Sequence, residues 1–319
     1  MTIGSYASDY NQGQILKGLV EGEIPINVSA ATLAPGALGP GSVERDVADE
    51  LRDLGVPVTR FGAIAGGSAA TNNAAFQAAA NEGIAISIPP GVFTLSDEID
   101  ITEPNTKFLG RHRKHSRIVS SYPFVFRLRE GADNFHCRDL GLESTDDTAT
   151  DLFFGLIYSN NESINGITIE WCYFTAPAAN TNALGLYADK SDGTNLIHNI
   201  RFLDNIVEEM GNSGICLQNH KHDVAAWRIR NFWIERNLFK SLGQANSDYG
   251  MGATLTGRVA NGWVRDNILD DILGIGLEMA NGNYNVHFLN NGFRNITRRG
   301  YGSATTPIAC SSNQSPKIP

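Results

Sequence analysis

The segment Ile200–Val207, which reads IRFLDNIV, decides the fold. Four further segments align with it without gaps: Ile167–Phe174 (ITIEWCYF), Phe232–Phe239 (FWIERNLF), Gly262–Leu269 (GWVRDNIL) and Val286–Phe293 (VHFLNNGF). Successive copies begin 33, 32, 30 and 24 residues apart. Several short strands within a period of this size are typical of a solenoid, in which each repeat buries its apolar side against the next.

Two kinds of position are constant across the five segments. The third and eighth residues are always apolar, as in Phe202 and Val207. The sixth residue is Asn in four copies, at Asn205, Asn237, Asn267 and Asn291, and Cys172 in the fifth. Stacked coils place like positions about 4.8 Å apart, so the sequence predicts apolar stacks inside and one file of side-chain amides. We expect this file at a bend, because Asn tolerates left-handed backbone angles.

A second, weaker series lies between these segments. Leucine holds the second place in each of its short copies, at Leu156, Leu186, Leu217, Leu255 and Leu277. Together the two series predict an all-β chain, a single-stranded parallel β-helix of about seven coils. A leucine-rich repeat would need a shorter and stricter leucine pattern, and a doubly wound sheet would need long helices, which the sequence after residue 83 does not predict.

The remaining segments differ from the repeats in composition and in expected secondary structure. Residues 1–43 are rich in Gly, Ala, Pro and Ser and are predicted to form an extended arm. Residues 44–83 form a helical neck and cap, with short helices expected at Glu44–Leu54 and at Asn73–Asn81, the latter capped by Thr71 or Asn72. Residues 84–300 hold the β-helix, and 301–319 a C-terminal tail.

Composition limits the partners. The chain has 319 residues, a net charge of −9 and a pI of about 5.3, which argues against nucleic acid as a partner. No signal peptide or apolar span is visible, so neither secretion by that route nor membrane insertion is expected. The spacing of Cys137, Cys172, Cys216 and Cys310 predicts no metal site, and we read the first three as core residues. No cofactor is expected, and His220-Lys221-His222 reads as a polar loop.

The stretch Val58–Ser96 carries a family resemblance. Its Phe61-Gly62-Ala63, the helical run from Thr71 to Ala79, and Ile86–Phe93 (ISIPPGVF) resemble the start of the pectate-lyase-like β-helix superfamily, as found in phage tailspikes and related glycan depolymerases. The resemblance implies a right-handed β-helix, an N-terminal α-helix that caps its open end, and a homotrimer. It specifies fold well and chemistry poorly.

The second series also predicts a mixed polar face. Tyr187, Gln218 and Glu278 follow its leucines, and Asp189, His220 and Arg258 lie slightly beyond. Flanking loops add His222, Asp223, Asp248 and Tyr249 as expected substrate-binding residues. A hydrolase would use Asp189 and Glu278 as its two carboxyl groups, whereas a lyase would use His220 or Tyr187 as base and Arg258 as the cation.

Outward positions of the first series hold two tryptophans in one column, Trp233 and Trp263. Outward apolar side chains usually mark an interface. The column is therefore a contact between the subunits of a trimer, a platform on which sugars stack, or a surface covered by a loop of the same chain.

These observations lead to three hypotheses. The first is a virion spike subunit that binds bacterial capsule or lipopolysaccharide and is attached to other virion proteins through residues 1–43. The second is a depolymerase of the same polysaccharide, either a glycosidase or a lyase. The third is a non-catalytic structural fibre component. Each places the protein in the virion, and outside the cell after lysis.

Overall fold

The computed structural model describes residues 55–147, 154–178, 181–188, 194–219, 227–245 and 250–304. The predicted arm at residues 1–43 and the helix expected at Glu44–Leu54 lie outside the described residues. Residues from Gly55 onward belong to one compact unit. Within the described ranges, no helix is both long and apolar enough to cross a membrane.

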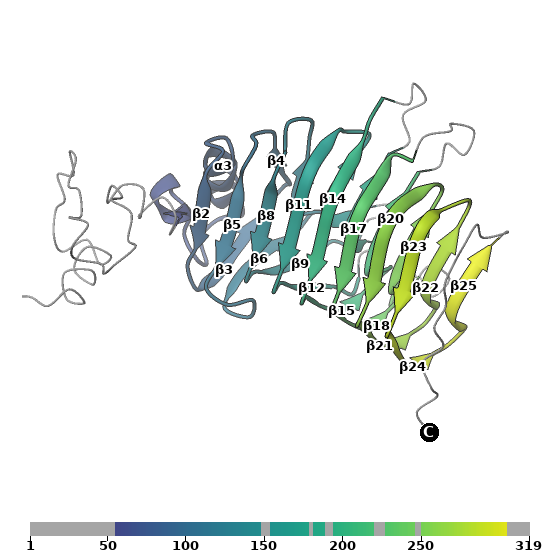
Figure 1. The fold of residues 1–319 in the computed structure, drawn as a ribbon. Coiled ribbons are helices and arrows are strands. Elements are labelled where there is room, and N and C mark those ends of the chain that lie inside the picture. The colour runs from purple at the N-terminus through teal and green to yellow at the C-terminus, as the bar shows by residue number, and fades with distance from the viewer. Residues whose placement is uncertain are drawn as a thin grey trace, which may run out of the picture. The chain divides into compact units, whose positions relative to one another are not determined.

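Three parallel sheets form this unit (Figure 1). The first sheet has nine strands: β1 (Val56–Pro57), β2 (Ala85–Ile88), β5 (Lys107–Gly110), β8 (Phe135–Arg138), β11 (Ile164–Glu170), β14 (Ile197–Leu203), β17 (Ile229–Glu235), β20 (Val259–Arg265) and β23 (Tyr284–Leu289). The second has eight: β3 (Gly91–Leu95), β6 (Ser116–Ser120), β9 (Gly141–Ser144), β12 (Tyr173–Ala176), β15 (Ile206–Met210), β18 (Leu238–Leu242), β21 (Ile268–Ile272) and β24 (Gly292–Ile296). The third also has eight: β4 (Ile99–Ile101), β7 (Phe126–Leu128), β10 (Gly155–Asn160), β13 (Asn182–Tyr187), β16 (Ile215–Gln218), β19 (Ala253–Thr256), β22 (Ile275–Ala280) and β25 (Arg299–Ala304).

Each turn of the chain adds one strand to every sheet. From β2 onward the strands enter the first, second and third sheets in rotation, which makes eight coils in the described residues. Strands of successive coils pair in parallel along each sheet, as β11 does with β14 and β14 with β17. The predicted right-handed parallel β-helix is confirmed, at eight coils where about seven were expected.

The register confirms the first repeat. Ile167, Ile200, Phe232, Gly262 and Val286 oppose one another on successive strands of the first sheet. Gly262 has a steric role in this column, because a Cβ atom there would lie 1.9 Å from the Phe232 ring. A larger inward residue in one coil is therefore matched by the smallest residue in the next.

The predicted file of asparagines is present and buried. The backbone N–H of Asn205 donates to Oδ1 of Asn237 at 2.9 Å, that of Asn237 to Asn267 at 2.9 Å, and that of Asn267 to Asn291 at 3.1 Å. The N–H of Cys172 starts the file by donating to Asn205 at 2.8 Å. Each amide therefore fixes the corner of the preceding coil.

The left-handed backbone angles lie one residue earlier than expected. Positive φ occurs at the residues that precede the file, Trp171, Asp204, Arg236, Asp266 and Asn290, and not at the file's asparagines. Each asparagine side chain instead accepts a hydrogen bond from the backbone of the preceding coil. Tolerance of left-handed backbone angles is therefore not the reason why asparagine recurs at this position.

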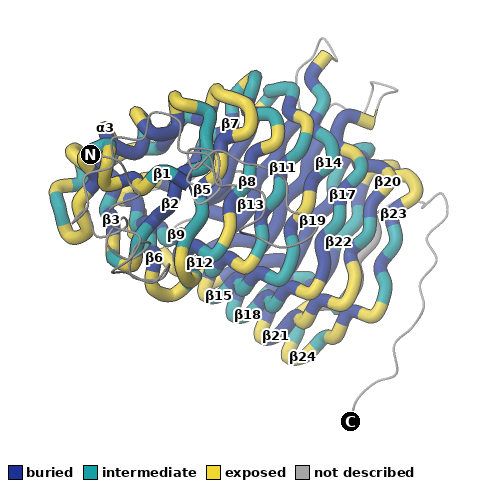
Figure 2. Tube along the Cα trace, turned by 60° about the vertical axis from the view of Figure 1, so that its left-hand side comes forward, coloured by how far each residue is buried: buried dark blue, intermediate teal, exposed yellow. Residues whose placement is uncertain are grey.

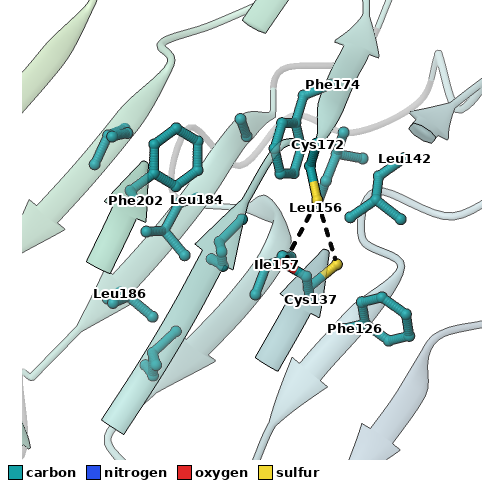
Figure 3. Close-up of a cluster of buried hydrophobic side chains, with 14 of the residues drawn as sticks. Phe126, Cys137, Leu142, Leu156, Ile157, Cys172, Phe174, Leu184, Leu186 and Phe202 are labelled. Atoms are coloured by element: carbon teal, nitrogen blue, oxygen red, sulfur yellow. Dashed lines mark hydrogen bonds between the residues drawn. The ribbon is translucent and has the colours of Figure 1, made fainter. Parts of the chain in front are cut away.

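Buried residues occur on strands of all three sheets (Figure 2), and their apolar side chains form one core cluster. Phe108 lies 4.5 Å from Phe126 between ring centroids, and Cys137 and Cys172 place their sulfur atoms 3.7 Å apart in the same core (Figure 3). The prediction that these two cysteines are core residues is confirmed. Cys216 is also buried, but it belongs to a separate cluster with Phe124.

A helix covers the start of the stack. The helix α3 spans Ala69–Ala80 and follows the short 3-10 helix η3 (Val58–Phe61). Phe76 of α3 packs against Phe93 and Phe108, with ring centroids 5.7 and 6.2 Å apart, and the predicted cap is confirmed.

The start of this helix differs from the expectation. It begins four residues before Asn73, and Ser68 is the N-cap, since its side chain accepts a hydrogen bond from the N–H of Thr71. Thr71 and Asn72 are therefore not the caps that the sequence predicted, because Ala69 and Ala70 extend the helix toward the better-placed serine. Asn72 is buried, and its Oδ1 accepts from the N–H of Ile64 at 2.8 Å.

Candidate functional site

Two residues of the predicted polar face, Tyr187 and Gln218, lie in one row on the outer face of the third sheet. Tyr187 of β13 opposes Gln218 of β16, which opposes Thr256 of β19. Leu186, Leu217 and Leu255 oppose one another just before them and point into the core, so the residues that follow point outward. The predicted alternation is confirmed for these three coils.

The leucine alignment is wrong at both ends of the series. Ile157 opposes Leu184, and Leu277 opposes Ala253, so Leu156 and Leu277 do not continue the leucine row. Glu278 consequently opposes Thr254, not Thr256. The Oγ1 of Thr254 donates to a Glu278 carboxylate oxygen at 2.8 Å, which holds this carboxyl group on the outer face one row away from Gln218.

The row around Gln218 is buried although it points away from the core. Tyr187 is 2% and Gln218 5% exposed. The Nε2 of Gln218 is buried and has no hydrogen-bond partner among the described residues. A buried amide donor without a partner costs about 1–3 kcal/mol, so this donor is a candidate contact for a ligand.

The other predicted groove residues are placed differently. Arg258 lies in the turn between β19 and β20 with a φ of 65°, and its backbone N–H donates to the carbonyl of Asn281. It therefore belongs to a corner and not to the row of Gln218. The predicted residues Asp189, His220, His222, Asp223, Asp248 and Tyr249 lie outside the described residues.

Sequence reasoning missed an aromatic cluster on the same outer face. Phe124 stacks on Tyr158 with ring centroids 5.2 Å apart, and Tyr158 lies 5.8 Å from Tyr187. Phe154 and Tyr122 extend the cluster by edge contacts to Phe124 at 5.2 and 4.9 Å. These rings come from turns and strands of different coils. The only sequence signal for the cluster was the alternation along Gly155–Tyr158, which could have indicated Tyr158.

Acidic residues gather beside this cluster at β4. Glu98 lies 3.4 Å from Arg127, and Asp100 lies 2.6 Å from Arg129. Burial, followed by a hydrogen bond with Asp97, raises the pKa of the Glu98 carboxyl above its usual value. The start of the third sheet's outer face is therefore rich in carboxylates.

The outer face of the first sheet carries the predicted tryptophan column. Arg201, Trp233, Trp263 and His287 oppose one another on β14, β17, β20 and β23, and we call these four residues the aromatic–cation ladder. Phe232, Val264 and Phe288 alternate with them and point into the core, which confirms that the ladder points outward.

Neighbouring members of the ladder contact each other. The guanidinium carbon of Arg201 lies 5.6 Å from the centroid of the Trp233 ring. The Trp263 and His287 rings are stacked with centroids 4.4 Å apart, and Arg265 lies 6.0 Å from the Trp263 centroid. Flat aromatic faces held in line by cations and a stacked imidazole form a preformed strip.

Bases contact the two carboxylates of the flanking column, Glu170 and Glu235. Glu235 is 5% exposed and is bound by Arg236 at 3.0 Å and Arg265 at 2.9 Å. Glu170 is bound by His136 at 3.0 Å. Burial lowers the pKa of His136 more than its hydrogen bond to Glu170 raises it.

Among the described residues, no group of three or more His, Cys, Asp or Glu side chains is arranged to hold a metal ion.

No protein-family model matches the sequence, and no curated protein is similar to it at a significant level. Solved structures are similar in fold. The catalytic unit of a GH87 alpha-1,3-glucanase from Streptomyces thermodiastaticus superposes with a TM-score of 0.57 at 15% identity, over 77% of this chain and 42% of that chain.

Two phage proteins are also similar. The enzymatically active domain of tailspike protein 2 of bacteriophage CBA120 gives a TM-score of 0.45 at 13% identity, over 78% of this chain and 43% of that one. A double mutant of the tailspike protein of E. coli bacteriophage HK620 gives 0.38 at 15% identity, over 94% and 67%. The chain spans less than half the length of the glucanase and of the CBA120 domain.

At these identities the likeness concerns fold. The three parallel sheets, the capping helix and the superposition on the glucanase agree on it. The chain therefore has a right-handed parallel β-helix fold.

Proposed function

We propose that the protein is a virion spike subunit that binds a bacterial surface polysaccharide, capsule or lipopolysaccharide, along the outer face of its first sheet. Residues 1–43 would attach it to other virion proteins, and three copies would assemble as a homotrimer. The glucanase that shares the fold acts on a polysaccharide, which makes a glycan ligand compatible with this fold without assigning one.

The aromatic–cation ladder is the observation that carries this proposal. Trp233 and Trp263 lie on adjacent strands in register and point outward from a regular sheet. Aromatic faces bind the apolar C–H faces of sugar rings, and a line of them suits an extended chain of sugars better than one small molecule. The ladder also contains Arg201 and His287, whose hydrogen-bond donors suit hydroxyl groups.

Binding of the full-length protein to capsule or lipopolysaccharide from candidate hosts tests the proposal. Trp233→Ala and Trp263→Ala should each weaken binding about 30-fold, which corresponds to about 2 kcal/mol for an interfacial hot spot. Trp171→Asn is the matched control: it removes an exposed tryptophan outside the ladder, at a left-handed position that asparagine tolerates.

Light scattering on the same variants separates the subunit-interface interpretation of the column from the sugar-platform interpretation. If both tryptophan variants bind glycan normally but dissociate into single chains, the ladder is a subunit interface and the proposal is wrong. If no surface polysaccharide binds the native protein, only the structural fibre hypothesis remains.

Cleavage of the same polysaccharide is a second candidate function, favoured by the unpartnered amide of Gln218 near Tyr187 on the third sheet. Glu278 would supply one carboxyl group there, and Asp189 the other. New reducing ends would indicate hydrolysis, and an unsaturated uronate in addition would indicate a lyase. If the protein is a hydrolase, Glu278→Gln should abolish hydrolysis while the fold is retained; full hydrolytic activity in this variant would exclude Glu278.

A further inference from the structure

Charge is distributed unevenly among the outer faces, although the chain as a whole is acidic. The outward positions of the first sheet include Lys107, Arg201 and Arg230, and all three are exposed. None of the three forms an ion pair with a described residue, whereas the carboxylates of this face, Glu170 and Glu235, are already bound by neighbouring bases.

The second sheet shows the opposite arrangement. Glu208, Lys240, Asp270 and Arg294 alternate in sign across its strands. Lys240 lies 2.6 Å from Glu208, and Arg294 pairs with Asp270. Glu209 and Asp271 on strands of this sheet form no ion pair with a described residue, so the charge left over on this face is negative.

On the third sheet Arg127 is already bound by Glu98 and Arg129 by Asp100, so these arginines offer no unpaired positive charge to an anion. Unpaired positive charge on a described outer face of the stack is thus found on the first sheet. The field of the molecule would direct a negatively charged chain toward that face.

The unpaired cations lie next to the tryptophans. Arg201 is the register neighbour of Trp233, and Arg230 precedes Trp233 by three residues on the same strand. A guanidinium binds carboxylate or phosphate through two parallel N–H groups, which a hydroxyl group cannot match. An aromatic face for the sugar ring and a guanidinium for its acidic group therefore occur together along this strip.

We infer that the ligand of the first sheet's outer face is an acidic polysaccharide, whose sugar rings stack on Trp233 and Trp263 while its anionic groups bind Arg201 and Arg230. The inference rests on the proposed function and narrows it to one class of glycan. Lys107, three coils before Arg201 on the same sheet, extends the positive strip toward the cap.

The experiment measures binding of the full-length protein to a panel of immobilised glycans. The carboxylated probes are alginate, hyaluronan and polysialic acid, the phosphate probe is a phosphodiester-linked teichoic acid, and the neutral probes are dextran and carboxyl-reduced alginate and hyaluronan. We expect binding to at least one acidic probe, at least tenfold weaker binding to its neutral counterpart, and an affinity that falls as salt rises. Loss on carboxyl reduction identifies a carboxylate ligand, and binding to the teichoic acid alone identifies a phosphate.

Three substitutions locate the effect. Arg201→Gln and Arg230→Gln should each weaken binding to the acidic probe about tenfold or more, since a hydrogen bond to a charged group contributes about 1.5–3 kcal/mol. Arg60→Gln in η3 removes the same charge away from the strip and should leave binding unchanged. Circular dichroism checks that each variant is folded.

The inference and the proposed function fail differently. If neutral and acidic glycans bind equally well and Arg201→Gln binds like the native protein, the acidic class is wrong but glycan binding stands. If Arg60→Gln weakens binding as much as Arg201→Gln, the attraction is a property of net charge and the strip is not the site. If no probe and no host polysaccharide binds, the proposed function itself is overturned.

Discussion

Asn237 shows how much one side chain contributes in this fold. Its Oδ1 accepts from the N–H of Asn205, and its Nδ2 donates to the carbonyl of Phe202 at 2.9 Å and to Oδ1 of Asn267 at 2.9 Å. The residue is buried, so water cannot replace these bonds. One amide therefore joins the backbone of the coil before it to the amide of the coil after it.

We predict that Asn237→Ala lowers the free energy of unfolding by about 2–6 kcal/mol, because it leaves two buried backbone groups unpaired at about 1–3 kcal/mol each. Urea denaturation measures the change. Asn281→Gly is the control, since Asn281 is exposed with a φ of 64° that glycine also adopts, and its effect should be about 0.5 kcal/mol or less. Equal effects of the two substitutions would contradict a special role for the buried file.

Sequence alone identified this file because Asn occupies one place in four aligned segments. It did not identify the left-handed residues beside the file, because Trp171 and Arg236 hold that conformation although their side chains do not favour it. It also missed the second left-handed column at Asn199, Asn231 and Asn261, since these asparagines precede the aligned segments. Residue type predicts a backbone bend poorly when the neighbouring coil imposes it.

At the scale of elements, the pair of strands β8 and β11 holds a titrating contact, His136 with Glu170. The pKa of His136 is lowered from 6.5, chiefly by burial. The unfolded chain therefore binds more protons than the folded one just below pH 6.5, so the stability is complete above that pH and is lost as the pH falls toward the folded-state pKa.

We predict that the free energy of unfolding decreases between pH 7 and pH 5, and that His136→Gln makes this decrease smaller. Urea denaturation at both pH values provides the measurement. Thr168→Val, at the neutral register neighbour of His136, should leave the slope unchanged. A steeper slope in His136→Gln would show that the Glu170 hydrogen bond, and not burial, dominates the titration.

The loop between β5 and β6 shows why elements are harder to predict than repeats. Arg113 reaches across several coils, donates to the carbonyl of Asp204 at 3.1 Å and lies 6.0 Å from the Trp171 ring. The two residues of the hydrogen bond are 91 positions apart in sequence. No periodic pattern predicts such a contact. The leucine alignment at Leu156 and Leu277 was wrong for a related reason: coils differ in length, and this shifts the register between strands of the third sheet.

At the scale of the whole molecule, the sequence predicted the architecture better than the site. The coil period and the apolar columns require only that equal positions stack, which the three continuous sheets confirm. The predicted polar face depends on corners and loops, and six of its ten expected residues lie outside the described ranges. The position of the tryptophan column was predicted, because Trp233 and Trp263 belong to the same repeat as the core residues.

Light scattering in solution addresses the assembly. We predict a mass about three times the 34.5 kDa of one chain. Native mass spectrometry at two concentrations checks that the complex is not a weak association. A single-chain mass in both measurements would contradict the homotrimer that the family resemblance implies, without affecting the glycan-binding test.

The continuous sheets also make the mechanical resistance of the stack depend on the direction of the applied force. Every interface between coils joins strands from all three sheets, so tension along the stacking axis is shared by many hydrogen bonds at once, and compression meets a core packed as densely as a crystal. Peeling an end coil sideways breaks those bonds one after another and needs much less force. A rod of this kind transmits thrust efficiently and yields first at its ends.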